Sequence, residues 1–133
     1  MKIKIIKSSE KSAYKSLNIS GNSQQINFVL WNPKAGVETT EGYTMSPSTV
    51  LEHEVAHAVM DATDRANHLK MVNTYDAQFD NKGESVIITG TEARTAISNG
   101  EFPKGYSRSN HRGRKIETPY VTSNKKKRYL NFE

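Results

Sequence analysis

The pentapeptide HEVAH at residues 53–57 limits the folds open to this chain more than any other segment. Two histidines four positions apart lie on the same face only in an α-helix, which completes a turn in 3.6 residues. In a helix, both imidazoles can reach one Zn²⁺ at about 2.0–2.1 Å. Because so short a pattern also arises by chance, the flanking residues must predict the helix independently.

The residues around the pentapeptide do predict a helix. Ser46 is a typical N-cap residue, and Pro47 suits the first helical position, where its missing N–H breaks no hydrogen bond. Apolar residues then recur every three or four positions and form one stripe of the helix. The stripe consists of Val50, Leu51, Val55, Ala58, Val59 and Ala62. The sequence therefore predicts a helix from 47 to about 62, with both histidines at the border of its apolar face.

Length and composition indicate one domain over residues 1–133, long enough to bury about two-thirds of the surface of its unfolded chain. The chain has no cysteine, so disulfides and thiolate metal sites are excluded. It also lacks an apolar stretch long enough for a Sec signal peptide or a transmembrane span. We therefore expect no membrane association and a cytoplasmic chain where it is made, or export by a route without a cleaved signal.

The formal net charge is +5, and basic residues gather late in the chain, ending in KKKR at 125–128. Such a segment can bind nucleic acid or acidic partners by releasing counterions. No nucleic-acid-binding motif accompanies the charge, however, so nucleic acid is not the partner that the sequence favours. We interpret the segment from about 123 as a basic, flexible tail.

Hydrophobic periodicity predicts short elements around the helix. Strands are predicted from period-two alternation or apolar runs, at 2–7, 25–32 and 84–90, with a shorter one near 120–122. A loop or hairpin is predicted at 34–45, and a short helix at 91–98 that ends at Gly100. Residues 65–83 are polar and carry no clear period. The expected fold class is α+β, with a short mixed or antiparallel sheet packed on the histidine helix.

A catalytic zinc usually has three protein ligands and one position for water, so the chain must supply a third. A glycine at 60 and a ligand at 63, as in the metzincin pattern, are excluded by Met60 and Thr63. Glu92, which opens the second predicted helix, is the preferred third ligand. A carboxylate in a first helical turn is also favoured by the helix dipole alone. The alternatives, in or just after the first helix, are Asp61, Asp64 and His68.

A helix with H-E-x-x-H, followed by a glutamate that opens a second helix, resembles the gluzincin class of zinc metallopeptidases. Within that class, SPSTVLEHEVAHAV and GTEARTAISNG are most similar to NleD-like bacterial effectors and Rhs-type toxin peptidase domains. The resemblance covers about residues 42–100, and its second motif is inexact because Thr95 separates Arg94 from Ala96. The ImmA/IrrE-like regulatory peptidases also place a Glu-Ala pair after the zinc helix and stay an alternative.

The resemblance implies a small zincin-like domain with one Zn²⁺ per chain, held by His53, His57 and Glu92. Its activity would be metalloendopeptidase hydrolysis of a protein or peptide by a zinc-activated water. Glu54 would be the general base, because it is rotated by about 100° from His53 around the helix. The substrate would add as a strand along the edge of 25–32. The protein would be a monomer and a domain of a larger toxin or effector.

The resemblance implies one further role, and helix spacing another. Arg114 or Tyr120 would stabilise the oxyanion, because the effector-like family places an arginine and a tyrosine near its C-terminus. Asp61, one turn beyond His57, would bind the second ring nitrogen of that histidine. His68 and His111 are interpreted as surface histidines. An inactive zinc-binding protein, and a non-catalytic basic binding module with a zincin-like fold, are the alternatives outside enzymes.

Overall fold

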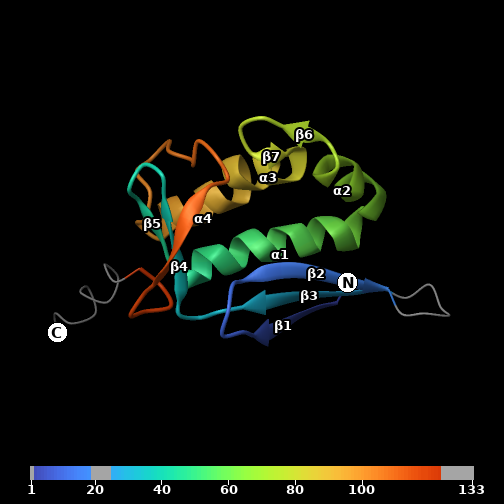
Figure 1. The fold of residues 1–133 in the computed structure, drawn as a ribbon, viewed down its shortest axis with the longest axis horizontal. Helices are drawn as coiled ribbons and strands as arrows, with labels where there is room; N and C mark the ends of the chain where they lie inside the picture. The colour runs from blue at the N-terminus through green and yellow to red at the C-terminus, as the bar shows by residue number, and fades with distance from the viewer. Residues whose placement is uncertain (1, 19–24, 124–133) are drawn as a thin grey trace.

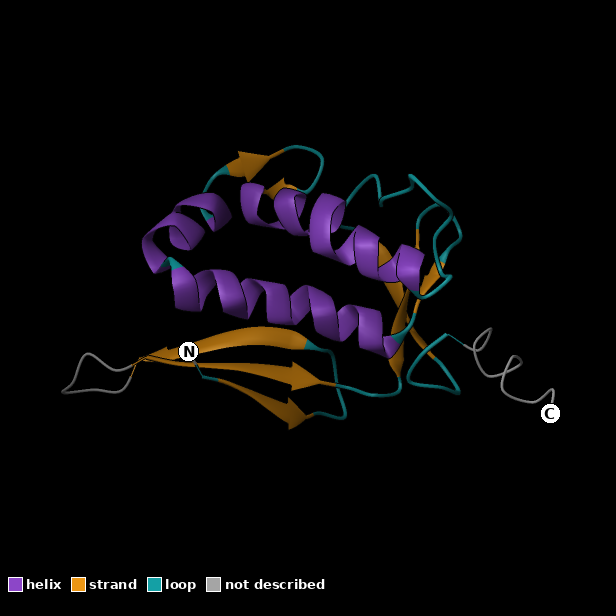
Figure 2. Cartoon of the chain, turned by 180° about the vertical axis from the view of Figure 1, so that it is seen from behind, coloured by secondary structure: helices purple, strands orange, loops and turns teal. Residues whose placement is uncertain are grey.

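The structure is a computed structural model that describes residues 2–18 and 25–123. A long helix, α1 (Pro47–Thr63), lies between a three-stranded sheet on one side and a layer of shorter helices on the other (Figure 1, Figure 2). The predicted α+β class and the predicted helix are confirmed. The tail predicted from about 123 lies almost wholly outside the described residues. None of the described helices is long and apolar enough to cross a membrane.

The sheet below α1 is mixed and has the strand order β1-β3-β2. β3 (Gln25–Trp31) runs parallel to β1 (Ile3–Lys7) and antiparallel to β2 (Ala13–Asn18). Alternate residues of β3 face α1: Asn27 and Val29 are buried, and Trp31 donates its indole N–H to the carbonyl oxygen of Pro47 at 2.8 Å. The strands predicted at 2–7 and 25–32 are therefore confirmed.

The position of β3 corrects one prediction. β3 is paired on both sides, so a substrate cannot add along the edge of 25–32. β2 is an edge strand of this sheet and also contacts α1, and the backbone N–H of Tyr14 in this strand donates to Glu54 Oε1 at 2.9 Å. β2, not β3, is the sheet edge beside the histidine helix.

A second sheet, with the order β5-β4-β8, closes one end of the molecule. β4 (Ala35–Thr39) pairs antiparallel with β5 (Thr44–Met45) and with β8 (Gly113–Glu117). Residues 34–45 thus form the predicted hairpin. Gly36 is required there, because a Cβ atom would lie 2.5 Å from the carbonyl oxygen of Met45. The strand predicted near 120–122 is wrong: those residues form bends, and the last described strand is β8.

The layer above α1 begins with α2 (Arg65–Val72) and a hairpin of β6 (Tyr75–Asp76) and β7 (Asp80–Asn81). α3 (Lys82–Ile87), a π-helical turn η1 (Ile88–Glu92) and α4 (Ala93–Ser98) then follow without a break. The strand predicted at 84–90 is therefore wrong, whereas the helix at 91–98 is largely confirmed. Burial of Ile87 and Ile88 overrides their β-propensity.

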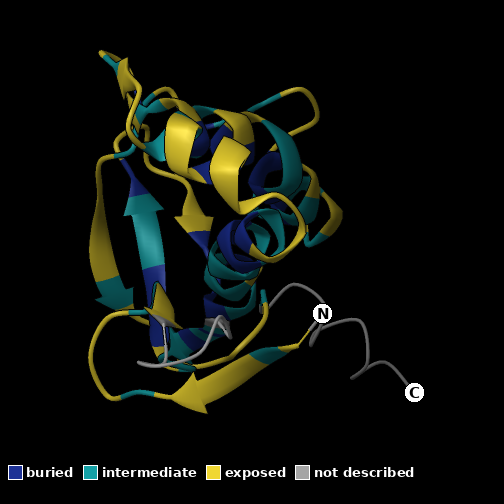
Figure 3. Ribbon diagram, turned by 90° about the vertical axis from the view of Figure 1, so that its right-hand side faces the viewer, coloured by how far each residue is buried: buried dark blue, intermediate teal, exposed yellow. Residues whose placement is uncertain are grey.

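Buried residues gather where α1 meets its two neighbouring layers (Figure 3). Part of this interior is apolar: Met45, Ala96 and Phe102 form a fully buried cluster near the second sheet. Another part is polar and ionisable, which is unusual for an interior, because charged groups are rarely buried without partners. Its buried members are His53, His57, Asp61, His68, Glu92 and Arg108.

Candidate metal centre

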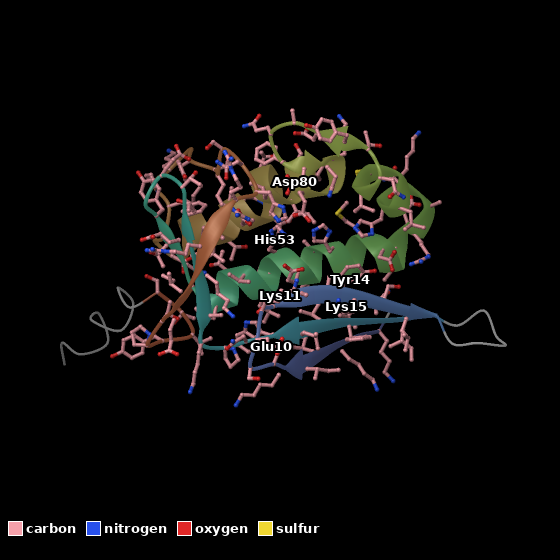
Figure 4. The ribbon with its side chains drawn as sticks, in the orientation of Figure 1. Glu10, Lys11, Tyr14, Lys15, His53 and Asp80 are labelled. Carbon is pink, nitrogen blue, oxygen red and sulfur yellow. The ribbon has the colours of Figure 1, made fainter. Side chains whose placement is uncertain are left out.

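α1 presents its two histidines to the helical layer above it, and Figure 4 shows His53 pointing into the space between α1 and that layer. Both histidines are 5% exposed. Their Nε2 atoms meet one carboxylate, that of Glu84 in the first turn of α3. Nε2 of His53 lies 2.9 Å from Oε1 of Glu84, and Nε2 of His57 lies 2.8 Å from Oε2. The two histidines therefore contact the two oxygens of one carboxylate.

The other ring nitrogen of each histidine, Nδ1, contacts a different buried side chain. Nδ1 of His53 lies 2.7 Å from Glu92 Oε1, and Nδ1 of His57 lies 3.1 Å from Nε2 of His68. A neutral imidazole that donates from Nδ1 keeps a free lone pair on Nε2. With a metal bound, the two contacts would therefore favour the tautomer in which the Nε2 lone pair of each histidine is available to the ion.

Two of the converging atoms lack hydrogen-bond partners. His57 Nε2 and Glu84 Oε1 are fully buried, yet neither makes a hydrogen bond of acceptable geometry despite the short contacts. Buried polar atoms without partners are rare and costly. A divalent cation between the three side chains would satisfy both atoms, and two histidines with one glutamate are a donor set of catalytic zinc. The residues present therefore fit a zinc ion.

Glu92, the preferred third ligand from the sequence, lies on the opposite side of His53 from Glu84. It is fully buried. Arg108 binds it through two hydrogen bonds, from Nε to Oε2 at 2.8 Å and from Nη2 to Oε1 at 2.6 Å. Burial would raise the pKa of Glu92, but His53 and Arg108 outweigh burial and lower it. Glu92 is thus a permanent anion behind His53, away from both Nε2 atoms.

The π-helical turn explains how Glu84 and Glu92 reach the same histidine. In a regular α-helix, residues eight positions apart are rotated by about 80° relative to each other. A π-turn inserts one extra residue, which reduces the offset to about 20°. Both glutamates therefore face α1, and they contact the two nitrogens of His53. The prediction of a strand at 84–90 did not identify Glu84 as a candidate ligand. An acidic residue three positions after the N-cap Asn81 is nevertheless a signal of a helix start.

Glu54 flanks the converging atoms without contacting them as a ligand. Its Oε1 accepts the N–H of Tyr14. Burial raises the pKa of Glu54, and the nearby His53 and His57 offset this increase only in part. The residue lines two cavities, of about 240 Å³ and about 590 Å³. A carboxylate with a raised pKa beside an open cavity is suited to proton transfer.

Asp61 does not contact His57 directly. Its Oδ1 lies 3.5 Å from Nδ1 of His68, which stands between the two, and Arg65 Nη1 binds both carboxylate oxygens at 2.9 and 3.0 Å. The interpretation of His68 as a surface histidine is wrong, because it is 3% exposed. Burial, together with the neighbouring His57, lowers the pKa of His68 and keeps it neutral.

Tyr14 of β2 completes this side of the site. Its ring stacks on His57, with centroids 6.1 Å apart and planes 20° apart, and meets His68 edge-on. Burial, with the nearby Asp61 carboxylate, raises the pKa of Tyr14 to about 12. The phenol therefore stays neutral under ordinary conditions, and its ring seals one side of His57.

Electrostatics hold a proton on the metal-free site. Burial alone would lower the pKa of His53, but its contacts with Glu84 and Glu92 outweigh burial and raise that pKa to about 10. Burial would raise the pKa of Glu84, but the two histidines hold it well below its ordinary range. Without metal, His53 is thus a cation between two carboxylates. A bound cation would replace this proton.

Arg114 and Tyr120 are not brought to the site. Arg114 has a side chain that is 75% exposed and pairs with Glu38 at 2.7 Å. Tyr120 lies after β8, beside a different cavity. Neither residue lines the cavities next to Glu54. Arg108, which binds Glu92, and His111, which lies beside Glu84, are the arginine and histidine that reach the site from the loop before β8, and spacing alone could not distinguish them from the other candidates.

Comparison with known families matched the family model Peptidase_M91, described as an effector protein, over residues 1–102. The matched range contains HEVAH and the two glutamates that contact His53, Glu84 and Glu92, and it ends before Arg108 and His111. The comparison with curated proteins found no match, and neither did the comparison with solved structures.

Proposed function

Because the chain belongs to the Peptidase_M91 family of effector proteins, we propose that it is a zinc-dependent endopeptidase that hydrolyses a peptide bond in a protein substrate. The observation that carries the proposal is the convergence of His53 Nε2, His57 Nε2 and the Glu84 carboxylate, next to Glu54. No such arrangement is needed for a basic binding module, because a buried cationic histidine between carboxylates contributes nothing to an exposed binding surface.

In this proposal His53, His57 and Glu84 are the zinc ligands. Glu84 takes the role that the sequence assigned to Glu92, and Glu92 with Arg108 orients His53 from behind. When bound, zinc would polarise the scissile carbonyl and lower the pKa of a water molecule from about 15.7 toward about 7. Asp61 does not contact His57 directly, because His68 lies between them. We therefore expect its effect on His57 to be indirect.

Glu54 is the proposed general base. The Tyr14 N–H fixes its Oε1 and so leaves Oε2 to accept the proton of the attacking water. The same carboxylate then returns that proton to the leaving amine. Its raised pKa supports this role, because a base near the operating pH can both accept and release a proton.

The substrate is proposed to lie along β2 in an extended conformation. The cavity of about 590 Å³ is lined by the consecutive residues 11–16, by Glu54 and by His57. An added strand there would pass the site within reach of the base. Arg114 and Tyr120 do not line these cavities, so the proposal assigns them no role in stabilising the oxyanion.

The test combines metal content with hydrolysis of denatured casein. Plasma mass spectrometry of the purified protein should give about one zinc per chain, and Glu84→Ala should abolish it. Glu54→Gln should retain the zinc and lose hydrolysis by at least about 10²-fold. Glu52→Gln, an exposed position on the same helix, is the matched control. Full hydrolysis by the Glu54→Gln protein would refute the mechanism, and no zinc in any form would refute the metal site.

A further inference from the structure

His111 repeats the arrangement of the two helix histidines. It lies in the loop before β8, with Nδ1 2.8 Å from Asp80 Oδ2 and Nε2 3.3 Å from Glu84 Oε1. Its ring stacks on that of His53, with centroids 6.0 Å apart and planes 7° apart. All three histidines therefore engage Nδ1 with an outer partner and turn Nε2 toward the same carboxylate. The interpretation of His111 as an ordinary surface histidine misses this arrangement.

The donor atoms of His53, Glu84 and His111 lie within 4.8 Å of one another. His57 joins them through Glu84. Four protein donors are the ligand set of a closed zinc site, whereas a catalytic site keeps one position for water. We propose that His111 is a fourth protein ligand of the resting metal centre, and that substrate binding displaces it. This inference rests on the metal site proposed above.

His111 is the donor that can leave most easily. The rings of His53 and His57 are buried on a regular helix, whereas the His111 side chain is 33% exposed and belongs to a loop. Its outer partner, Asp80, has a side chain that is 71% exposed. A contact between such exposed groups contributes little stability, because water and salt compete for both partners. Displacing His111 therefore disturbs no buried ion pair.

Because His111 lies between two cavities, its displacement would change the space open to a substrate. The cavities of about 240 Å³ and about 590 Å³ share four lining residues, which are Lys11, Ser12, Glu54 and His111. With His111 on the metal, the two cavities stay separate at the point where the base lies. Movement of His111 away from Glu84 would join them into one cleft, wide enough for a peptide that extends past Glu54 on both sides.

The backbone conformation of Asp80 helps to place its carboxylate beside His111. Asp80 has φ = 74°, and it is the only non-glycine residue with positive φ in the described parts of the chain. Aspartate tolerates this left-handed conformation better than most residues, yet the conformation remains uncommon. The preceding turn is held by Asp76 Oδ1, which accepts the N–H groups of Gln78 and Phe79 at 2.9 Å each. Asp80 lies across the site from α1 (Figure 4), where its carboxylate orients the His111 ring.

The experiment compares Co²⁺-loaded wild type with Co²⁺-loaded His111→Ala by visible absorption, and measures the Zn²⁺ affinity of both. The wild type should show the intense bands of four-coordinate cobalt. In His111→Ala, water should take the vacated position and keep the cobalt four-coordinate, so the bands should shift as an oxygen donor replaces a nitrogen donor, and Zn²⁺ affinity should fall by about tenfold or more. Hydrolysis of casein at saturating zinc should increase, because a competing ligand has been removed. Asp80→Asn should shift each quantity in the same direction by less.

Arg112→Ala is the matched control, because Arg112 is exposed and adjacent to His111. An unchanged cobalt spectrum and zinc affinity in His111→Ala would overturn the proposal. A loss of hydrolysis with both unchanged would make His111 a donor to the transition state instead of a ligand. Either result leaves the zinc peptidase itself intact. If wild type binds neither Co²⁺ nor Zn²⁺, it is the proposed function that fails.

Discussion

The Nε2 atoms of His53 and His57 contact the same carboxylate, whereas their Nδ1 atoms have different partners. Behind His53 lies a fully buried ion pair, Glu92 with Arg108, joined at 2.6 and 2.8 Å. Nδ1 of His57 instead contacts a second histidine, His68, whose own Nδ1 lies 3.5 Å from Asp61 Oδ1 without forming a hydrogen bond. One histidine thus rests against a full negative charge and the other against a neutral ring. The two histidines are therefore oriented by partners of different charge.

The difference has a chemical consequence. A carboxylate at Nδ1 makes an imidazole a stronger electron donor at Nε2 than a neutral ring does. In the metal-free protein the contacts of His53 with Glu84 and Glu92 outweigh burial and raise its pKa to about 10. His57 depends more on geometry, because Tyr14 stacks on its ring. We therefore expect a substitution that removes charge to weaken zinc binding by His53. A substitution that removes packing should weaken zinc binding by His57.

The largest effect is expected for Arg108→Ala, which would leave the buried Glu92 carboxylate without its cation. Removal of one partner from a buried pair typically costs about 3–5 kcal/mol. The free energy of unfolding of the metal-free protein, from urea titration, should fall by that amount. Arg108→Ala combined with Glu92→Gln should recover part of the loss, because no charge is then left unpaired. A loss below about 1 kcal/mol would mean that water solvates Glu92.

The outer carboxylates should differ in their effect on zinc. Glu92→Gln removes a charge in direct contact with His53, so Zn²⁺ affinity should fall by about 10- to 100-fold. Asp61→Asn acts only through His68, so its effect should be smaller. Competition with a colorimetric chelator measures both affinities. Equal losses would abolish the distinction between the two sides. A loss with Asp61→Asn alone would make Asp61 the important carboxylate.

The two sides should also respond to pH in opposite directions in the metal-free protein. The pKa of His53 is raised from 6.5 to about 10, so its contribution to stability is complete below pH 6.5 and is lost as the pH rises toward 10. The pKa of His68 is lowered, so the unfolded chain takes up its proton more readily and stability is lost as the pH falls through 6.5.

Urea unfolding of the metal-free protein between pH 5 and pH 10 measures both changes. His68→Asn should remove part of the loss below pH 6.5 and leave the loss at alkaline pH in place. Glu92→Gln should do the reverse, because it removes one of the carboxylates that raise the pKa of His53. Saturating zinc should abolish the alkaline loss, since the cation replaces the proton on His53. A pH profile that His68→Asn leaves unchanged would argue against a neutral His68 in the folded protein.

The sequence predicted what a single helix determines. His53, Glu54 and His57 are positioned by the 3.6-residue period, and the helix begins at Pro47 as its flanks indicate. Glu84 and Glu92 were harder, because their roles depend on a π-turn that no periodicity reveals. Arg108 and His111 reach the site from a loop through tertiary packing, so neither propensity nor spacing could distinguish them from Arg114 or Tyr120.

The smallest effect is expected for Arg65→Ala. Arg65 binds both oxygens of Asp61, but its side chain is 44% exposed and the pair spans one helical turn. Solvent screens the half-exposed guanidinium of Arg65, and His68 would still face the buried Asp61 carboxylate. Zn²⁺ affinity should therefore change by less than about threefold, as measured by chelator competition, with Lys70→Ala on the same helix as the control. A fall as large as that of Asp61→Asn would show that the His57 side, too, depends on a charge pair.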